Sequence, residues 1–155
     1  MNTRKNKGIT LIALVITIII LIIISGISIT GTIRGQKQTE ESLQMSELNI
    51  IQHAILERAT KAKLTKETLP GTTIEKEKLQ AIIEDIQNRT GKQISLKGNE
   101  TDYKQLNKKD LENLGITKEE DIFIVNYITG EVINETKRVT TSGKILYIYS
   151  KNDNS

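Results

Sequence analysis

An uncharged, strongly apolar segment lies close to the amino terminus of this chain. Residues 8–33 contain no Asp, Glu, Lys or Arg, and sixteen of the twenty-one residues from Ile9 to Ile29 are apolar. As a helix, this stretch would be about 31 Å long, close to the roughly 30 Å hydrocarbon core of a bilayer. Its apolar residues occupy every side of the helix, as expected for a helix surrounded by lipid. The sequence therefore predicts a transmembrane helix over residues 9–33.

Basic residues directly precede this apolar segment. Arg4, Lys5 and Lys7 lie within the first seven residues, whereas only Arg34 and Lys37 follow the segment before acidic residues appear. Because Lys and Arg are enriched on the cytoplasmic side of membrane segments, this asymmetry places the amino terminus in the cytoplasm. We therefore expect a single-pass protein of the cell membrane with an extracytoplasmic domain over residues 34–155.

The basic character of the chain also comes from its leading residues. The chain has 22 Lys and Arg against 19 Asp and Glu, which gives a formal net charge of +3. Without Arg4, Lys5 and Lys7, the two signs balance at 19 each. Since no later basic patch is interleaved with aromatic residues, no nucleic-acid partner is expected.

Three kinds of amino-terminal segment share these features. A secretory signal peptide has a shorter apolar region and a small-residue cleavage site, and residues 26–28 (Gly-Ile-Ser) make only a mediocre site. An uncleaved signal anchor fits the hydrophobicity, but it does not account for the junction at residues 7–12, KGITLI. The third kind is a short leader that is cut at this junction.

The run KGITLIALV at residues 7–15 resembles the class III leader of type IV prepilins and pseudopilins, of the Gram-positive type. The resemblance implies that a prepilin peptidase removes the leader, residues 1–8, by cutting between Gly8 and Ile9 on the cytoplasmic face. It also implies methylation of the new amino terminus at Ile9. Glycine suits such a cut because it lets a protease approach the backbone closely. The basic leader residues would stay beside anionic headgroups.

One position departs from the family pattern. The family usually has Glu at the fifth mature position, where it is thought to pair with the free amino terminus of a neighbouring subunit, and this chain has Ala13. In this respect the chain resembles minor, tip-located subunits, and also some Gram-positive pilin-like proteins that dispense with this glutamate. The resemblance thus implies membrane lipid, the peptidase and other pilin-like subunits as partners.

A helical period returns after the membrane segment, over residues 40–63, and it defines two apolar stripes. The first stripe has spacings of three and four residues and consists of Leu48, Ile51, Ile55, Ala59 and Ala62. The second lies nearly opposite and consists of Leu43, Ile50 and Ala54. Either one stripe packs in the domain while the other meets neighbouring subunits, or both are buried within the domain.

Downstream patterns predict short helices followed by strands. Turn residues 69–71 (Leu-Pro-Gly) should end the long helix, and Thr72 with Glu75 forms a capping box for a helix that stops near Gly91. We expect a short strand over residues 93–96 and a helix over residues 103–114. A β-hairpin should turn at Thr129-Gly130, between residues 122–128 and 132–133, and a last strand should cover residues 144–149.

These elements predict an α+β fold. A long amino-terminal helix, transmembrane in its first half, precedes a small helical segment and a carboxyl-terminal antiparallel β-sheet. This order is typical of pilin-like subunits. The stretch from Leu114 to Ile133 also resembles their carboxyl-terminal hairpin.

The sequence offers little catalytic chemistry. It has no Cys and a single His, His53, which should be an exposed helix residue, so the usual Cys- and His-based metal sites are excluded. The acidic run Glu119-Glu120-Asp121 lacks the alternating ligands of a calcium loop and should form a solvated turn. We expect a structural protein with no enzymatic activity, metal or cofactor.

Overall fold

The structure is a computed structural model that describes residues 6–117 and 119–148, with the backbone alone described for residues 6–10 and 22–38. The chain divides into two compact units, Met1–Glu40 and Glu41–Ser155. Helix α1, Asn6–Thr65, contributes residues to both units. It ends four residues before the predicted turn at Leu69, and Lys66 adopts a positive φ of 59° directly after it.

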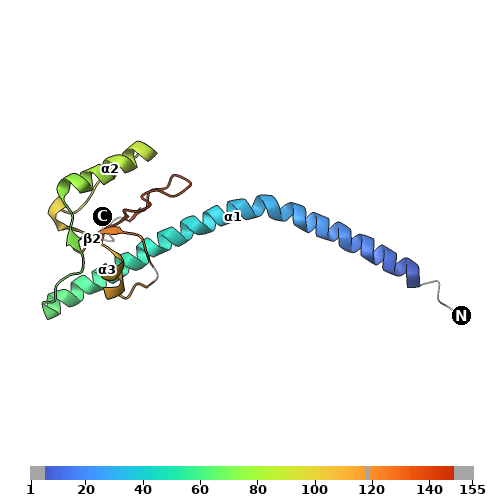
Figure 1. Ribbon diagram of the computed structural model, residues 1–155, viewed down its shortest axis with the longest axis horizontal. Coiled ribbons are helices and arrows are strands. Elements are labelled where there is room, and N and C mark those ends of the chain that lie inside the picture. Colours follow the sequence, from blue (N-terminus) through green and yellow to red (C-terminus); the bar gives the residue numbers. More distant parts are fainter. Residues whose placement is uncertain (1–5, 118, 149–155) are drawn as a thin grey trace, which may run out of the picture. The chain divides into compact units, whose positions relative to one another are not determined.

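The second unit is α+β, as predicted. Its sheet has five antiparallel strands in the order β1-β2-β3-β4-β5, so each strand pairs with its neighbour along the chain. The elements after α1 are β1 (Thr72–Thr73), α2 (Lys76–Thr90), the 3-10 helix η1 (Glu100–Asp102), β2 (Tyr103–Leu106), α3 (Lys108–Asn113), β3 (Phe123–Asn126), β4 (Val132–Asn134) and β5 (Tyr147–Ile148) (Figure 1).

The carboxyl-terminal part of α1 covers one face of the sheet. The first of the two predicted stripes is the packing face, since Leu48, Ile51 and Ile55 are at most 1% exposed. Spacings of three and four residues place these side chains on one side of a helix, where they can meet a sheet together. The residues that they pack with, besides Ala59, include Leu106, Leu111, Phe123, Val125, Tyr127, Val132 and Leu146.

Helix α2 covers the opposite face. Its buried residues Leu79, Ile82 and Ile86 belong to a second apolar cluster with Ile124 and Ile133. Since successive strand residues point to opposite faces, β3 and β4 supply alternate side chains to the two clusters. The second unit is therefore a three-layer arrangement in which the sheet lies between α1 and α2 (Figure 1).

The predicted hairpin between β3 and β4 is confirmed. Gly130 has a φ of +78°, which an L side chain rarely adopts. A Cβ at this position would also lie 3.2 Å from the side chain of Leu56. The backbone oxygen of Gly130 accepts a hydrogen bond of 2.8 Å from the side-chain amide of Gln52. This turn is thus fixed onto α1.

The helix predicted over residues 103–114 is wrong in its first part. Residues 103–106 form β2, and α3 begins only at Lys108. Tyr103 and Leu106 are both buried, but they belong to different clusters on the two faces of the sheet. A real capping box marks the boundary, because Asn107 accepts from the Asp110 backbone and the Asp110 carboxylate accepts from the Asn107 backbone.

Two other local predictions are also wrong. Thr72 does not cap α2, because it pairs with Gln105 as part of β1, and the N-cap Glu75 makes no side-chain capping bond. No strand forms over residues 93–96. The adjoining backbone N–H groups of Lys97 and Gly98 instead donate hydrogen bonds to the carboxylate of Glu131, which directly precedes β4.

Truncating the α1 stripe should destabilise the second unit. We expect Ile55→Ala to lower the free energy of unfolding by about 2–5 kcal/mol, because it leaves a cavity between α1 and the sheet. Urea unfolding of the full chain in detergent, followed by tyrosine fluorescence, measures the change. The matched control is Ile128→Ala, which removes the same atoms from a side chain that is 72% exposed and should cost at most about 0.5 kcal/mol. Equal losses would contradict this packing.

Candidate functional site

The predicted processing site lies mostly outside the described residues. Arg4 and Lys5 are not described, and for Lys7, Gly8 and Ile9 the backbone alone is described, as part of α1. The contacts of these side chains therefore lie outside the described structure. Cleavage after Gly8 and methylation of Ile9 remain predictions.

Ala13, at the position where the family has Glu, is an exposed helix residue. Its backbone oxygen accepts a hydrogen bond of 2.7 Å from the hydroxyl of Thr17, one turn later. The hydroxyl of Thr17 thus has its hydrogen-bond partner within the helix. The small side chain of Ala13 contributes no charge to this part of α1.

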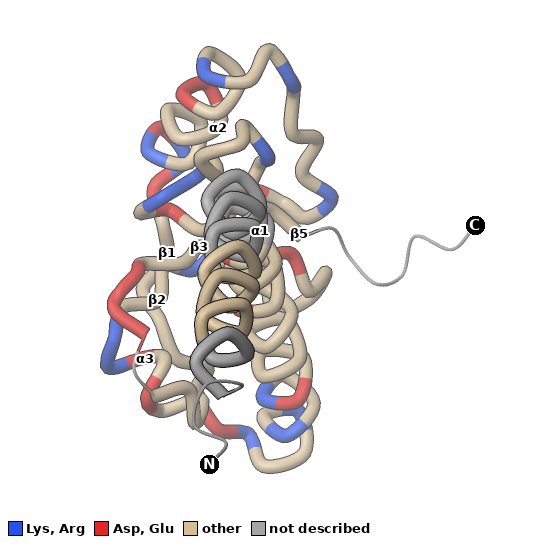
Figure 2. The backbone as a smooth tube through the Cα atoms, turned by 90° about the vertical axis from the view of Figure 1, so that its right-hand side faces the viewer, with Lys and Arg blue, Asp and Glu red and all other residues tan. Residues whose placement is uncertain are grey.

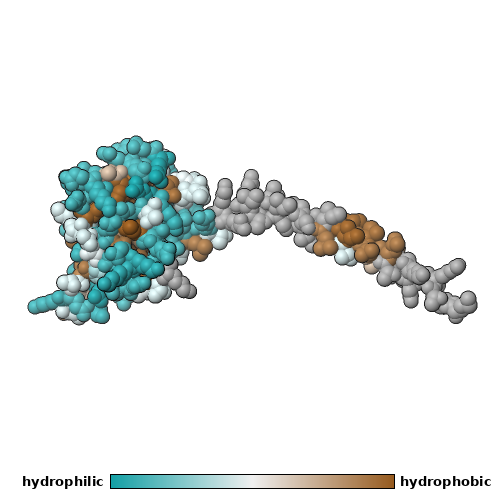
Figure 3. Space-filling view, in the orientation of Figure 1, coloured by the Kyte–Doolittle hydropathy of each residue, from teal (hydrophilic) through white to brown (hydrophobic). Residues whose placement is uncertain are grey.

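The described side chains of the apolar segment, residues 11–21, are exposed all around the helix. Its nine large apolar side chains have exposed fractions between 46% and 65%, and they form the brown stretch between two grey stretches at the right of Figure 3. Contiguous apolar surface of this extent indicates an interaction surface. The predicted span over residues 9–33 includes side chains that are not described. Among the described residues, no helix combines the length and the apolarity needed to cross a membrane.

The second apolar stripe of α1 is not buried by the second unit. Leu43 and Ile50 are 60% and 55% exposed, and Ala54 is partly exposed. The described structure therefore fits the first of the two predicted alternatives, in which one stripe packs in the domain and the second stripe faces outward. Beside Ile50 lies a hollow of about 340 Å³, which Glu47 and Glu119 also line.

A buried carboxylate, Glu131, organises the α2 face of the sheet. Glu131 is fully buried and accepts hydrogen bonds from three hydroxyl groups. The donors are Tyr103 and Tyr147, each at 2.5 Å, and Thr129 at 2.6 Å. The backbone N–H groups of Lys97 and Gly98 donate at 2.8 and 3.1 Å. Both carboxylate oxygens are thus fully engaged.

These donors also set the ionisation of Glu131. Burial by itself raises its pKa, but the hydrogen bonds, that of Thr129 first, outweigh burial and leave the pKa below its usual value. Burial and the adjacent carboxylate raise the pKa of Tyr103. The cluster therefore holds a charged carboxylate and neutral tyrosines, and it joins residues 97–98 to β4. Sequence reasoning did not identify Glu131 as a functional or structural centre.

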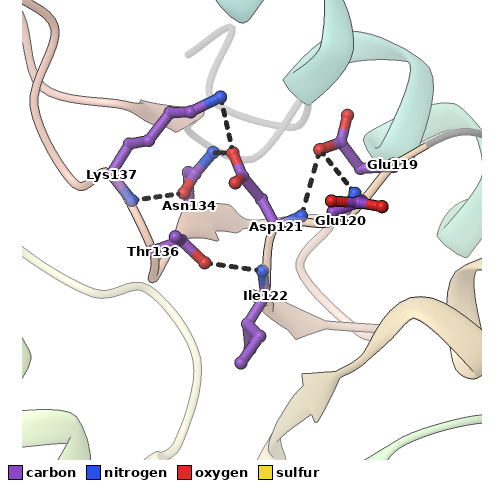
Figure 4. A network of polar contacts seen from close by, with 7 residues as sticks. All are labelled: Glu119, Glu120, Asp121, Ile122, Asn134, Thr136 and Lys137. Atoms are coloured by element: carbon purple, nitrogen blue, oxygen red, sulfur yellow. Dashed lines mark hydrogen bonds and ion pairs between the residues drawn. The ribbon is translucent and has the colours of Figure 1, made fainter.

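The prediction that the acidic run is solvated holds for Glu120, which is exposed, but is wrong for Asp121. Asp121 is buried, forms an ion pair of 2.8 Å with Lys137 and accepts a hydrogen bond of 2.9 Å from Asn134 (Figure 4). Glu119 accepts from the backbone N–H groups of residues 120 and 121. These contacts give the run a structural role, because they fix the chain entering β3 to the chain leaving β4.

The described residues hold no recognisable catalytic or metal centre. No group of three His, Cys, Asp or Glu among them could hold a metal ion, and His53 is exposed on α1 as predicted. Acidic and basic residues are interspersed along the second unit (Figure 2). Comparison with known proteins finds no matching family model, no similar curated protein and no similar solved structure. The surfaces of α1 are therefore the best candidates for function.

Replacing Glu131 should make the fold less stable and less sensitive to acid. We expect Glu131→Gln to lower the free energy of unfolding by about 1–3 kcal/mol, because an amide NH₂ would face donors. Since its folded-state pKa lies below the unfolded value near 4.5, Glu131 stabilises the fold fully above that pH, and the contribution is lost as the pH falls through the folded-state pKa.

Unfolding in urea between pH 7 and pH 3 measures both effects. The wild-type chain should lose stability more steeply below about pH 4.5 than the Glu131→Gln variant. The control is Glu112→Gln, which changes the same group at an exposed position of α3. If Glu131→Gln and Glu112→Gln have the same pH profile as the wild type, the buried carboxylate does not contribute as described.

Proposed function

We propose that this chain is a pilin-like structural subunit, a minor pilin or pseudopilin, of a type IV pilus or a type II secretion-like filament. The observation that carries the proposal is the junction of Lys7, Gly8 and Ile9 with a charge-free apolar run. A prepilin peptidase removes residues 1–8, and Ile9 becomes a methylated amino terminus. The exposed apolar side chains of residues 11–21 support the proposal, because they require lipid or helical neighbours.

The precursor is a single-pass protein of the cell membrane. Its amino terminus stays in the cytoplasm, and residues 34–155 lie outside the membrane. Transfer from lipid to a filament replaces lipid contacts of the apolar helix with helix contacts, so it is driven by packing rather than by further removal of apolar surface from water. Small residues such as Gly26 and Gly31 favour close approach of helices in such an environment.

The residue at position 13 favours a subunit present in few copies. A free amino terminus at Ile9 would be an isolated charge, and a charge at the centre of a bilayer costs about 2.5–3.5 kcal/mol. A carboxylate at position 13 of a neighbour would offset this cost, but Ala13 supplies none. A subunit at the tip of a filament needs no copy ahead of it, so the absence of this carboxylate is least costly there.

The extracytoplasmic domain acts as a structural and contact module. Its sheet is covered on both faces, and its buried polar groups serve the fold. The three-layer domain can hold its carboxyl-terminal loops and the outer side of α1 in fixed positions. This arrangement suits a subunit whose surfaces decide what the filament contacts.

Blocking the cut is the direct test. We expect the full-length wild-type protein from its native cells to begin at Ile9, and a Gly8→Leu variant to keep residues 1–8, because a bulky side chain prevents close approach of the peptidase. Mass spectrometry of the amino terminus measures this outcome, and sedimentation of sheared filaments measures incorporation.

The matched control is Gly31→Leu, the same substitution near the other end of the apolar run, which should leave processing unchanged. A native chain that retains residues 1–8 would instead identify a single-pass membrane anchor for an extracytoplasmic binding or sensing domain. That result overturns the proposed function.

A further inference from the structure

A hollow of about 420 Å³ lies beside β5, the last strand of the sheet. We call this hollow the β5 pocket. Four apolar side chains and two lysines from separate parts of the second unit line it. They are Met45 of α1, Lys92 shortly after α2, Lys144 and Ile145 just before β5, and Tyr147 and Ile148 of β5 itself. The volume is within the range of about 300–1,000 Å³ that small-molecule sites occupy.

Apolar side chains form most of the lining of the β5 pocket. Met45, Ile145 and Ile148 are only partly buried, so the fold leaves some of their apolar surface uncovered. The hydroxyl of Tyr147 donates to the buried Glu131 at 2.5 Å, which leaves the ring as the part of this side chain that can line the pocket. A ligand with an apolar body would remove this surface from water, which is favourable.

Two lysines give the β5 pocket a positive charge. Lys92 and Lys144 are exposed, and no Asp or Glu is among the described residues that line the pocket. Lys92 forms no ion pair in the part of the chain that the structure describes. The Nζ atom of Lys144 lies 3.4 Å from Oε1 of Glu41, and Glu41 also accepts a hydrogen bond from the hydroxyl of Ser142. Two positive charges against one negative charge leave an excess of one positive charge.

This charge balance specifies the kind of ligand. Two ammonium groups that line one hollow repel each other, and an anion between them replaces the repulsion with two attractions. The excess of one positive charge matches a monoanion. The apolar stems of the lysines can lie along the lining while their ammonium groups reach the anion. A small inorganic anion would leave the apolar lining uncovered, so the ligand must have an apolar body as well.

We propose that the β5 pocket binds a small aliphatic carboxylate. Its chain lies against Met45, Ile145 and Ile148, and its carboxylate lies between the ammonium groups of Lys92 and Lys144. The pocket is built only from residues of the second unit. The proposal is therefore independent of processing at Gly8, and its failure leaves the proposed function unchanged.

The methionines of the chain provide a direct measurement. The chain has only two, Met1 and Met45, so carbon-13 labelling of the methionine methyl groups gives one signal inside the pocket and one outside it. The sample is the unprocessed full chain in lipid nanodiscs at pH 7, and the probe is octanoate. We expect the Met45 signal to shift saturably, with half-saturation at about 1–10 mM, as for a ligand of this size. The Met1 signal should not follow the same curve.

Two uncharged or oppositely charged probes with the same chain length test the role of charge. Octanol and protonated octylamine should need at least about fivefold higher concentrations than octanoate for the same shift of Met45, because neither supplies an anion to the lysines. Equal curves for the three probes would show that only the apolar chain is recognised. That result overturns the proposal, and so does the absence of any shift of Met45 with octanoate.

Charge reversal on the protein gives the complementary test. Lys92→Glu should raise the half-saturation concentration of octanoate at least about fivefold and should strengthen the binding of octylamine. Because Lys92 is exposed, the fold should not depend on it. The matched control is Lys109→Glu, which makes the same change at an exposed residue of α3 outside the pocket and should leave both curves unchanged.

Two further results would contradict the proposal. If Lys92→Glu and Lys109→Glu weaken octanoate binding equally, the net charge of the chain and not the β5 pocket governs it. If octanoate binds only after residues 150–155 are removed, this segment of the chain is the occupant of the pocket.

Discussion

The packing of α1 against the sheet holds the second unit together. The strands of the described sheet contain two to four residues each, which is too short for a sheet to be stable without a covering layer. The side chains of Leu48, Ile51 and Ile55 provide that layer on one face, and α2 provides it on the other. The hydrogen bond from Gln52 to the β3–β4 turn adds a directional contact to this apolar packing. A helix that is fixed so firmly on one side can present its other side in a defined orientation.

Glu131 performs a different task on the α2 face. Residues 92–98 have no regular strand partner, yet backbone N–H groups in this stretch need acceptors when they are removed from water. The carboxylate of Glu131 accepts from two of them and from three hydroxyl groups. The close approach also explains Gly98, because a Cβ there would overlap the side chain of Asn126. A single buried charge thus replaces a strand as the means of holding this segment.

The sequence predicted those elements whose signals are local and periodic. The Leu48 stripe and the Thr129-Gly130 hairpin have the spacing and the turn residues of their final structures. The helix predicted from Tyr103 failed in its first part because the spacing of three residues from Tyr103 to Leu106, repeated from Leu111 to Leu114, resembles a helical period. It hides the change from strand to helix at Asn107. The capping box predicted at Thr72 failed because pairing with β2 took precedence.

Long-range polar contacts could not be read from the sequence in this way. Glu131 follows a turn glycine, where an acidic residue ordinarily faces solvent, and its tyrosine partners are 28 and 16 residues away. One signal was present in the sequence, since Glu131 directly precedes the apolar residues of β4. In the structure, both faces of this sheet pack in apolar clusters. The proposed cleavage site lies outside the described side chains, so its support comes from the sequence pattern alone.

The short β1 strand has a consequence for how copies of this domain can meet. A long exposed strand offers unpaired backbone groups to a neighbouring chain, and such edges promote uncontrolled sheet extension. Here β1 contains only Thr72 and Thr73, and Pro70, two residues before it, has no N–H group to offer. This side of the domain is therefore a poor template for strand addition. Crowded copies are discouraged from joining through their backbones there.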